Sequence, residues 1–362
     1  MKNDDYTFMC QAIEIGHQGR VTAPPNPWVG CVIVKNGKVI GEGFHRTAGE
    51  PHAEVHALKQ AGAEAAGATA YVTLEPCSHF GRTPPCTNAL IQAKIARVVV
   101  AIEDPDERVS GKGIALLREA GIEVDVGIAE EEAKRSLAPY LFQRKKGLPY
   151  CILKAAITID GCMAASDRTS QWITGPEARQ NAHQLRAESQ AIAIGAGTAT
   201  ADHPALTVRE SKIIPLIPPL RVLFDRSGKV NVQGSLFNNK LGPLIIFTTE
   251  KGLQIKETQW KEVGAEIHVV DSLLQALQIL GKQGILQLLV EGGPTLLSSF
   301  WKENLAQELV VYTGPRLLGS EGIPLFNTLS IKTIDKSPVL KLISTQQLGN
   351  TVKSCYQVNE SF

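Results

Sequence analysis

Short apolar runs that alternate with amphipathic helical patterns restrict the fold of this sequence more than any other feature. A helical pattern over the first 20 residues is followed by two apolar runs within residues 30–45, joined through Asn36 and Gly37, a strong hairpin signal. From residue 51 to about residue 130, helical and strand patterns alternate. A hairpin followed by this alternation predicts a mixed sheet flanked by helices.

A second block of strand and helix patterns follows a basic segment at residues 144–147, which ends a single predicted helix over residues 131–147. We interpret that basic segment as a linker rather than a nucleic-acid patch. A chain of 362 residues is too long for one typical core, so we predict two α/β domains, residues 1–146 and 147–362. The strands predicted in the second block are residues 150–161, 190–199, 220–225, 242–249, 266–271, 284–293 and 307–319.

Composition excludes several classes of protein. The net charge of +1 provides no strong field toward nucleic acid or a membrane surface. No apolar run approaches the ~18 residues of a membrane span, and acidic residues stand where a signal peptide has basic ones. The seven cysteines are scattered and odd in number, which indicates reduced thiols. We therefore expect a cytoplasmic protein that binds neither nucleic acid nor membranes.

Two motifs, PHAEVHAL at residues 51–58 and LEPCSHFGRTPPC at residues 74–86, contain residue types that bind metals. Zinc prefers four ligands from histidine nitrogen and cysteine thiolate, and a catalytic site leaves one position for water. His52, Cys77 and Cys86 supply three, each where a strand or loop is expected to enter a helix, whose N-terminus favours thiolates. Glu54 is spaced to reach the water and move protons. The sequence therefore predicts a catalytic zinc site.

Two other interpretations of these motifs remain. In the first, His52 is a helix-start histidine and the cysteines are small core residues. The combined occurrence of H-A-E and P-C in order favours the metal site over it. In the second, a zincin helix uses His52 and His56, but that motif needs glutamate where this chain has Ala53. His56 is therefore interpreted as a residue that packs on the helix or behind the ligands.

The order H-x-E…P-C is the signature of zinc deaminases, although eight residues rather than two separate the cysteines here. The insert SHFGRTPP, the segment HAEVHAL and the segment NPWVG at residues 26–30 resemble the bacterial riboflavin-biosynthesis bifunctional deaminase/reductase family. The resemblance extends along the whole chain. It implies a cytidine-deaminase-like first domain, in which a mixed sheet is flanked by helices.

The same resemblance implies roles for individual residues. His52, Cys77 and Cys86 would hold zinc, and Glu54 would carry protons. The substrate would be a diaminopyrimidinone that carries a ribosylamino 5-phosphate and loses one ring amine as ammonia. Asn26 is expected to read the edge of the pyrimidine ring, and the expected contacts from the insert are His79, Arg82 and Thr83. For Arg82, a solvated surface side chain is the alternative.

Two glycine-rich segments in the second domain are candidate nucleotide sites when only their residue types are taken into account. GAGTAT at residues 195–200 follows a strand but lacks the third small residue and the distant acid of a Rossmann fingerprint. VEGGPTLL at residues 290–297 ends a strand, contains two glycines and starts a helix, where N–H groups can hold a phosphate. A bare glycine turn would have the same sequence.

The resemblance also covers the second domain, through LKxAxTxDG at residues 153–161, SQWIT at residues 170–174, TxxxDxPxLTVR at residues 198–209 and EGGPTL at residues 291–296. It implies a dihydrofolate-reductase-like α/β fold that uses NADPH. The expected cofactor contacts are Ala156, Trp172, Thr198, Asp202, Arg226, Gly293, Pro294, Thr295, Leu296, Leu297, Ser298 and Ser299. The expected substrate contacts are Ser170, Leu206, Arg209 and Glu291.

More specific roles are expected for four residues of the second domain. Lys154 and Asp202 would be catalytic and flank the ribose, with a solvated lysine at a strand end as the alternative for Lys154. Arg209 is expected to bind the substrate phosphate. Arg226, after a predicted strand, is the candidate for the 2′-phosphate of NADPH.

We therefore expect a two-domain, homo-oligomeric enzyme that performs zinc-dependent deamination and NADPH-dependent reduction in riboflavin synthesis. The alternative is a nucleoside or nucleic-acid zinc deaminase with an appended binding domain, which near-neutral charge and few aromatic residues disfavour. A non-catalytic zinc module is a third possibility, and it would need neither Glu54 nor an open coordination position.

Overall fold

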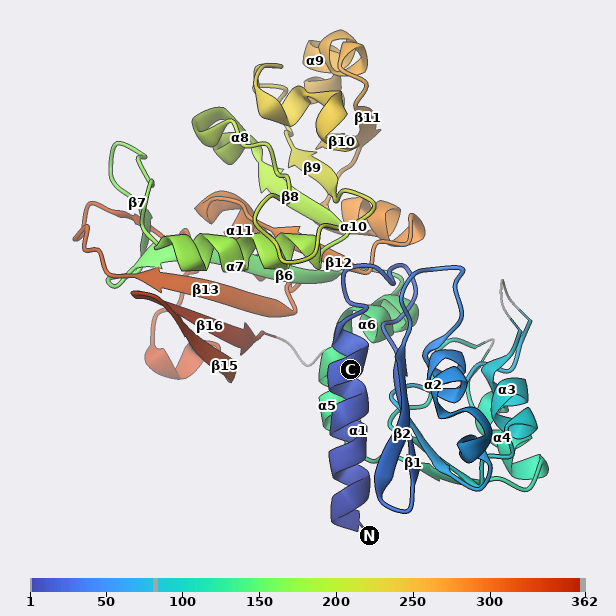
Figure 1. The fold of residues 1–362 in the computed structure, drawn as a ribbon. Coiled ribbons are helices and arrows are strands. Elements are labelled where there is room, and N and C mark those ends of the chain that lie inside the picture. The colour runs from blue at the N-terminus through green and yellow to red at the C-terminus, as the bar shows by residue number, and fades with distance from the viewer. Residues whose placement is uncertain (1, 81–83, 108, 359–362) are drawn as a thin grey trace. The chain divides into compact units, whose positions relative to one another are not determined.

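The computed structural model describes residues 2–80, 84–107 and 109–358 and divides the chain into two compact units, Met1–Gly147 and Leu148–Phe362. Figure 1 shows the elements of both units. Each unit contains its own sheet and its own apolar core, so each is described by itself.

The first unit is built on a five-stranded mixed sheet, in the order β2-β1-β3-β4-β5. The strand β1 is antiparallel to β2 and β3, whereas β3, β4 and β5 are parallel. The predicted hairpin between β1 and β2 is confirmed: Asn36 and Gly37 have φ of 50° and 72°, as a tight two-residue turn requires. The strands are β1 (Gly30–Lys35), β2 (Lys38–Phe44), β3 (Thr69–Val72), β4 (Arg97–Val100) and β5 (Glu123–Val126).

Helices flank this sheet, as the mixed pattern predicts. The helix expected over residues 131–147 is two helices that meet at Leu137, because Pro139 lacks an N–H and is suited to the first turn of a new helix. The helices are α1 (Lys2–His17), α2 (Ala53–Ala61), α3 (Cys86–Gln92), α4 (Lys112–Glu119), α5 (Glu130–Ser136) and α6 (Ala138–Lys146), and a 3-10 turn spans Gly62–Ala65.

Helix α2 lies unusually close to strand β2. A Cβ atom on Gly43 would lie 2.3 Å from the carbonyl oxygen of Ala53, and one on Gly41 would lie 2.3 Å from that of Ala57. The helix presents buried alanines and the strand presents glycines, so no large side chain lies between the two elements. This contact determines where the N-terminus of α2, and with it His52, lies on the sheet.

The second unit contains a nine-stranded sheet in the order β11-β10-β9-β8-β12-β6-β13-β16-β15. It is parallel from β11 to β13, and a C-terminal antiparallel hairpin, β16 and β15, extends it. Its strands are β6 (Tyr150–Thr158), β8 (Ala191–Gly195), β9 (Leu220–Phe224), β10 (Leu244–Thr248), β11 (Glu266–Val269), β12 (Gln287–Val290), β13 (Glu308–Gly314), β15 (Lys341–Leu348) and β16 (Thr351–Gln357). The sequence predictions include the parallel strands but not the hairpin.

The helices of the second unit connect its parallel strands, as expected of a parallel sheet (Figure 1). They are α7 (Pro176–Ala187), α8 (Ala196–Asp202), α9 (Glu250–Glu262), α10 (Leu273–Lys282) and α11 (Pro294–Lys302). Two short strands, β7 (Cys162–Ala164) and β14 (Ile323–Pro324), form a separate pair. Within the described ranges, every helix is too short or too polar to cross a lipid bilayer.

Candidate active sites

The structure brings the three predicted metal ligands of the first unit together. One ligand atom from each of His52, Cys77 and Cys86 lies within 4.8 Å of the others. His52 Nδ1 is 3.2 Å from Cys86 Sγ and 3.5 Å from Cys77 Sγ. Ligands bound to one zinc ion at tetrahedral angles are about 3.5 Å apart, so these residues fit the ion. With three protein ligands, a fourth position remains for water.

The two cysteines reach the site from different local structures. Cys86 is the first residue of α3, after Pro85, and its main-chain N–H donates a hydrogen bond to Cys77 Sγ at 3.4 Å. Cys77 lies in the loop after β3, so the expectation that each ligand stands where a chain enters a helix is wrong for this residue. A hydrogen bond from Cys86, together with the contact to His52, lowers the pKa of Cys77 and favours its thiolate.

Glu75 anchors the loop that carries Cys77. This buried carboxylate lies two residues before Cys77 and accepts hydrogen bonds from four main-chain N–H groups. At Gly113, one of these donors, a Cβ would lie 2.0 Å from the carbonyl oxygen of Pro76, so the loop packs directly on the start of α4. The donors are Asp104, Gly111, Gly113 and Ile114, at 2.9–3.2 Å.

Glu54 lies in the first turn of α2, two residues beyond His52, and is 3% exposed. Burial raises the pKa of its carboxyl group, which the charge of His52 partly opposes. A raised pKa means that this carboxyl group takes up a proton more readily than an exposed glutamate does, which suits a group that must both accept and donate a proton. Its placement beside the ligands thus suits proton transfer.

The sequence predictions missed His45, which lies beside the cluster. Asn26 Nδ2 is 3.0 Å from His45 Nε2, and the His45 and His52 rings are nearly perpendicular to each other, at 83°, with their centroids 5.1 Å apart. Asn26 is thus close to the metal ligands, where the resemblance places substrate. His45 follows β2 without a local motif around it, so no spacing rule identifies it.

The other predicted residues of this site are less completely defined. His79 is half-buried in the loop after Cys77, whereas Arg82 and Thr83 lie outside the described residues. His56 is not part of the ligand cluster. Its ring lines a shallow depression with Arg46 and Lys59, which agrees with a packed helix residue.

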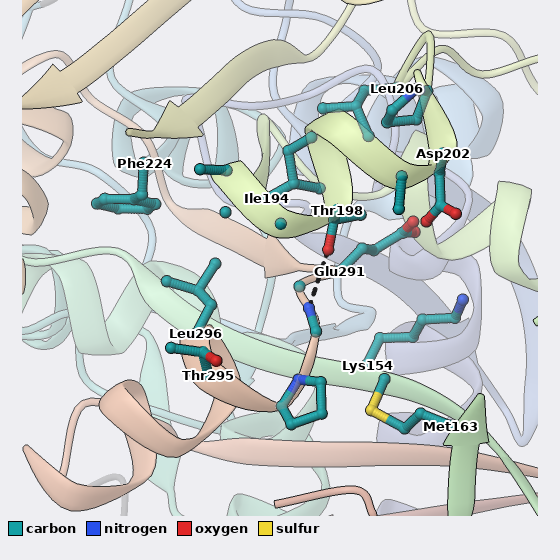
Figure 2. Close-up of a pocket in the computed structure, with 18 of the residues that line it drawn as sticks. Lys154, Met163, Ile194, Thr198, Asp202, Leu206, Phe224, Glu291, Thr295 and Leu296 are labelled. Carbon is teal, nitrogen blue, oxygen red and sulfur yellow. Dashed lines mark hydrogen bonds between the residues drawn. The ribbon is translucent and has the colours of Figure 1, made fainter. Parts of the chain in front are cut away.

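The second unit has a cleft of about 1230 Å³ at the carboxyl ends of its central parallel strands, where open α/β sheets bind ligands. Figure 2 shows part of its lining. Fifteen of the residues that the resemblance assigns to cofactor and substrate line it, although they come from distant parts of the chain. They are Lys154, Ala156, Ser170, Trp172, Thr198, Asp202, Leu206, Arg209, Arg226, Glu291, Gly293, Pro294, Thr295, Leu296 and Ser299.

Three predicted residues differ from expectation in their placement. Lys154 lies within β6 and is half-buried, so the alternative of a solvated lysine at a strand end is wrong. Burial lowers its pKa, and the nearby charge of Glu291 partly restores it. Leu297 and Ser298 face away from the cleft: Leu297 is in the apolar core, and the buried Ser298 hydroxyl accepts a hydrogen bond from the main chain of Asn327.

The glycine turn before α11 has the form of an anion site. Gly293 is the residue before the first turn, Pro294 begins the helix, and the Gly293 N–H donates to Thr198 Oγ1 at 3.0 Å (Figure 2). This bond ties the turn to α8, which starts within the other glycine segment, at Ala196. N–H groups at a helix start favour phosphate, and the cleft gives it access.

Arg186 and His183, both on α7, line the cleft and were not predicted. Arg186 forms a two-point ion pair with Glu291, Nε to Oε1 at 2.9 Å and Nη2 to Oε2 at 2.6 Å. Burial alone would raise the pKa of Glu291, but the charges of Arg186 and Lys154 hold it at about 2. In Figure 2 the charged ends of Lys154, Asp202 and Glu291 point to one side of the cleft. The pattern of α7 is an ordinary amphipathic helix, which gives no signal for either residue.

Comparisons with known proteins agree with both sites. Residues 2–102 match the cytidine and deoxycytidylate deaminase zinc-binding region, and residues 149–354 match the RibD C-terminal domain. The riboflavin biosynthesis protein RibD of Chlamydia pneumoniae is 46% identical over 97% of this chain and 95% of its own length. The structure of Acinetobacter baumannii RibD is 39% identical, with a TM-score of 0.90 over 99% of this chain and 100% of that one.

A second solved structure is a Thermotoga maritima diaminohydroxyphosphoribosylaminopyrimidine deaminase/5-amino-6-(5-phosphoribosylamino)uracil reductase. It is 33% identical, with a TM-score of 0.87 over 99% of each chain. A zinc-binding deaminase domain followed by a reductase domain, which implies a nicotinamide cofactor, defines a bifunctional deaminase/reductase. The chain belongs to the RibD family of riboflavin-biosynthesis enzymes, as its motifs predict.

Proposed function

We propose that this enzyme catalyses two consecutive reactions of riboflavin biosynthesis. The first is hydrolytic, zinc-dependent deamination of 2,5-diamino-6-ribosylamino-4(3H)-pyrimidinone 5′-phosphate. The second is NADPH-dependent reduction of the ribose of 5-amino-6-(5-phosphoribosylamino)uracil to a ribityl chain. The observation that carries the proposal is the cluster of His52, Cys77 and Cys86 beside buried Glu54, in a chain that continues into a reductase domain.

In the deaminase site, His52, Cys77 and Cys86 would hold zinc, which would lower the pKa of a water molecule and so make it a nucleophile at neutral pH. Glu54 accepts the proton of the attacking water and passes it to the ring amine, which leaves as ammonia. Asn26, held beside His45, is positioned to read the edge of the pyrimidine ring. His79, Arg82 and Thr83 are proposed as further substrate contacts, from the insert between the cysteines.

The residues of the reductase cleft would hold NADPH, which would supply the hydride for reduction of the ring-opened imine at the anomeric carbon of the sugar. Lys154 and Asp202 flank the ribose, where an amine and a carboxylate can move the protons that ring opening and reduction require. Ser170, Leu206, Arg209 and Glu291 contact the substrate, and the Arg209 guanidinium pairs with its phosphate. The proposal is supported by the presence of all these residues in one cleft.

The cofactor contacts are proposed along the other walls of the cleft. Gly293 and the cleft-lining residues at the start of α11 (Pro294, Thr295, Leu296 and Ser299) hold a phosphate of NADPH with Thr198, and Ala156 and Trp172 also contact NADPH. Arg226 pairs with the 2′-phosphate. We further propose that residues 1–146 and 147–362 act independently, and that the enzyme is a cytoplasmic homo-oligomer.

The test is incubation of the purified chain with the diaminopyrimidinone ribosyl phosphate, zinc and NADPH, with ammonia release and NADPH oxidation measured separately. Ammonia should appear without NADPH, and NADPH should be oxidised only once deaminated substrate is present. A fragment of residues 1–146, checked for folding by circular dichroism and for zinc content, should release ammonia alone. A folded, zinc-loaded fragment that is inactive until residues 147–362 are added would contradict independent sites.

A further inference from the structure

Helix α7 holds the chain segment that carries two of the proposed substrate contacts of the reductase. Residues 203–219, all described, follow α8 and form neither helix nor strand. Leu206 and Arg209 belong to this segment and line the cleft. A segment without secondary structure of its own takes its position from the groups that it contacts. The placement of both side chains thus depends on these contacts.

Two side chains of α7 contact the main chain of this segment. His183 and Arg186 are three residues apart, so they lie on one face of the helix. Arg186 Nη1 donates to the carbonyl oxygen of Thr207 at 3.2 Å, and the Arg209 main-chain N–H donates to His183 Nδ1 at 3.3 Å. The bond to His183 is at the residue whose side chain is proposed to bind phosphate.

His183 is itself buried, with 7% exposure, at the wall of the cleft. To accept the bond, Nδ1 must carry no proton. Burial and then the charges of Arg186 and Arg209 lower the pKa of His183, while Glu210 and Glu291 act in the opposite direction. The acceptor form is therefore the one favoured at neutral pH.

We propose that His183 is a positioning residue of the reductase, which holds the main chain at Arg209 so that Arg209 and Leu206 meet the phosphorylated substrate. This inference rests on the proposed function. The competing explanation is a histidine that only fills space under the segment. The two differ in whether the acceptor atom, rather than the volume of the ring, affects substrate binding.

Matched substitutions separate the two explanations. His183→Asn keeps an acceptor close to the position of Nδ1, His183→Leu has similar size without one, and His183→Gln moves the acceptor one methylene outward. With the full chain, NADPH and 5-amino-6-(5-phosphoribosylamino)uracil, the Leu and Gln variants should raise the substrate KM about tenfold, because the Arg209 N–H is left unpaired. The Asn variant should stay within about threefold, and the KM for NADPH should change in none of them.

Thermal unfolding followed by circular dichroism checks that the second unit of each variant folds, and ammonia release from the diamino substrate, which occurs in the other unit, serves as the internal control for the amount of active protein. If the Leu variant does not fold, the comparison of Asn with Gln decides alone. Equal substrate KM values for the Asn and Gln variants would overturn the inference, as would a Leu variant within twofold of the unaltered enzyme. Unaltered enzyme that does not oxidise NADPH with this substrate would instead overturn the proposed function, and the inference with it.

In an Arg209→Ala background, His183→Leu should raise the substrate KM by less than about twofold, because the charged side chain, which accounts for most of the binding that His183 supports, is already absent and only the weaker Leu206 contact can still be lost. A full tenfold additional increase would show that His183 acts by another route and would overturn the inference.

Discussion

The metal cluster and the reductase cleft are assembled in different ways. His52 and Cys86 are separated by only 34 positions, and each ligand lies in a segment that a buried carboxylate, a glycine contact or a helix start holds in place. The cleft instead collects residues from β6, from the strand ends and from segments as distant as Lys154 and Ser299. A local site depends on a few atoms at short range, so single substitutions should be nearly all-or-none there. A dispersed site shares its binding among many contacts, so single losses should be graded.

The largest effect is expected for Glu54→Gln. The three ligands are unchanged, so zinc content should be normal, while ammonia release should fall about a hundredfold or more because the proton carrier is lost. Zinc content by elemental analysis and ammonia release would be measured on one preparation, and reduction of the deaminated substrate should be unaffected. Near-normal ammonia release from zinc-loaded protein would remove Glu54 from this role. Cys86→Ser is the complementary variant, and it should lose zinc itself.

Lys154→Ala should give the next effect, on the reductase alone. Lys154 is half-buried and near the charge of Glu291, so its removal takes away a proton-transfer group and leaves Glu291 with Arg186 as its remaining cationic partner. NADPH oxidation with deaminated substrate should fall by about tenfold to a hundredfold. Normal NADPH oxidation in this variant would contradict the assigned role, and circular dichroism would show whether a loss of oxidation comes from unfolding of the second unit instead.

Arg226→Gln should have a smaller and more selective effect. Loss of one charge-assisted contact to a phosphate should raise the KM for NADPH about tenfold and leave the KM for NADH unchanged. Steady-state kinetics with both cofactors measures this directly, and Arg226→Lys should retain part of the preference. Equal changes for NADPH and NADH would show that Arg226 does not contact the 2′-phosphate.

Gly43→Ala should act on stability rather than on chemistry. The added methyl group meets the carbonyl oxygen of Ala53, so we expect a loss of about 1–3 kcal/mol in the free energy of unfolding of the first unit. Urea unfolding followed by circular dichroism would measure it. Gly197→Ala, in α8 of the second unit, is the control for a glycine-to-alanine change with open space around it, and it should leave the unfolding of the first unit unchanged. Equal stability of the two variants would mean that α2 can shift without loss.

Much of the fold could be predicted from sequence because its signals are local. Asn36 and Gly37 specify a hairpin turn, and apolar runs between helical patterns specify parallel strands. The break at Leu137 was missed because the apolar pattern continues through it, and only Pro139 signals the new helix. The hairpin of β15 and β16 was missed because most residues of β15 are exposed, which leaves no apolar run.

The metal site and the reductase cleft also differ in how far the sequence predicts them. The spacing of His52, Cys77 and Cys86 predicts a metal site from the residues alone, because zinc chemistry restricts the ligand types. In the cleft, the residues themselves indicate only the glycine turn at residues 290–297. The other cleft residues could be named only through resemblance, since residues such as Ala156 and Thr198 have no distinctive chemistry. His183 and Arg186 contribute through contacts to residues 26 and 105 positions away, which a linear pattern does not contain. His45 contacts Asn26 and His52, which are closer in the sequence, but the spacing follows no known motif.

The two glycines on β2 have a consequence for attempts to transfer this metal site to another protein. A designer who copied His52, Glu54 and the cysteines onto a different scaffold would have the ligands but not the distance between helix and strand that Gly41 and Gly43 allow. Gly41 and Gly43 would therefore have to be transferred together with the ligands. In a saturation mutagenesis experiment these positions should be as intolerant as catalytic ones, although neither has a side-chain atom that could take part in the reaction.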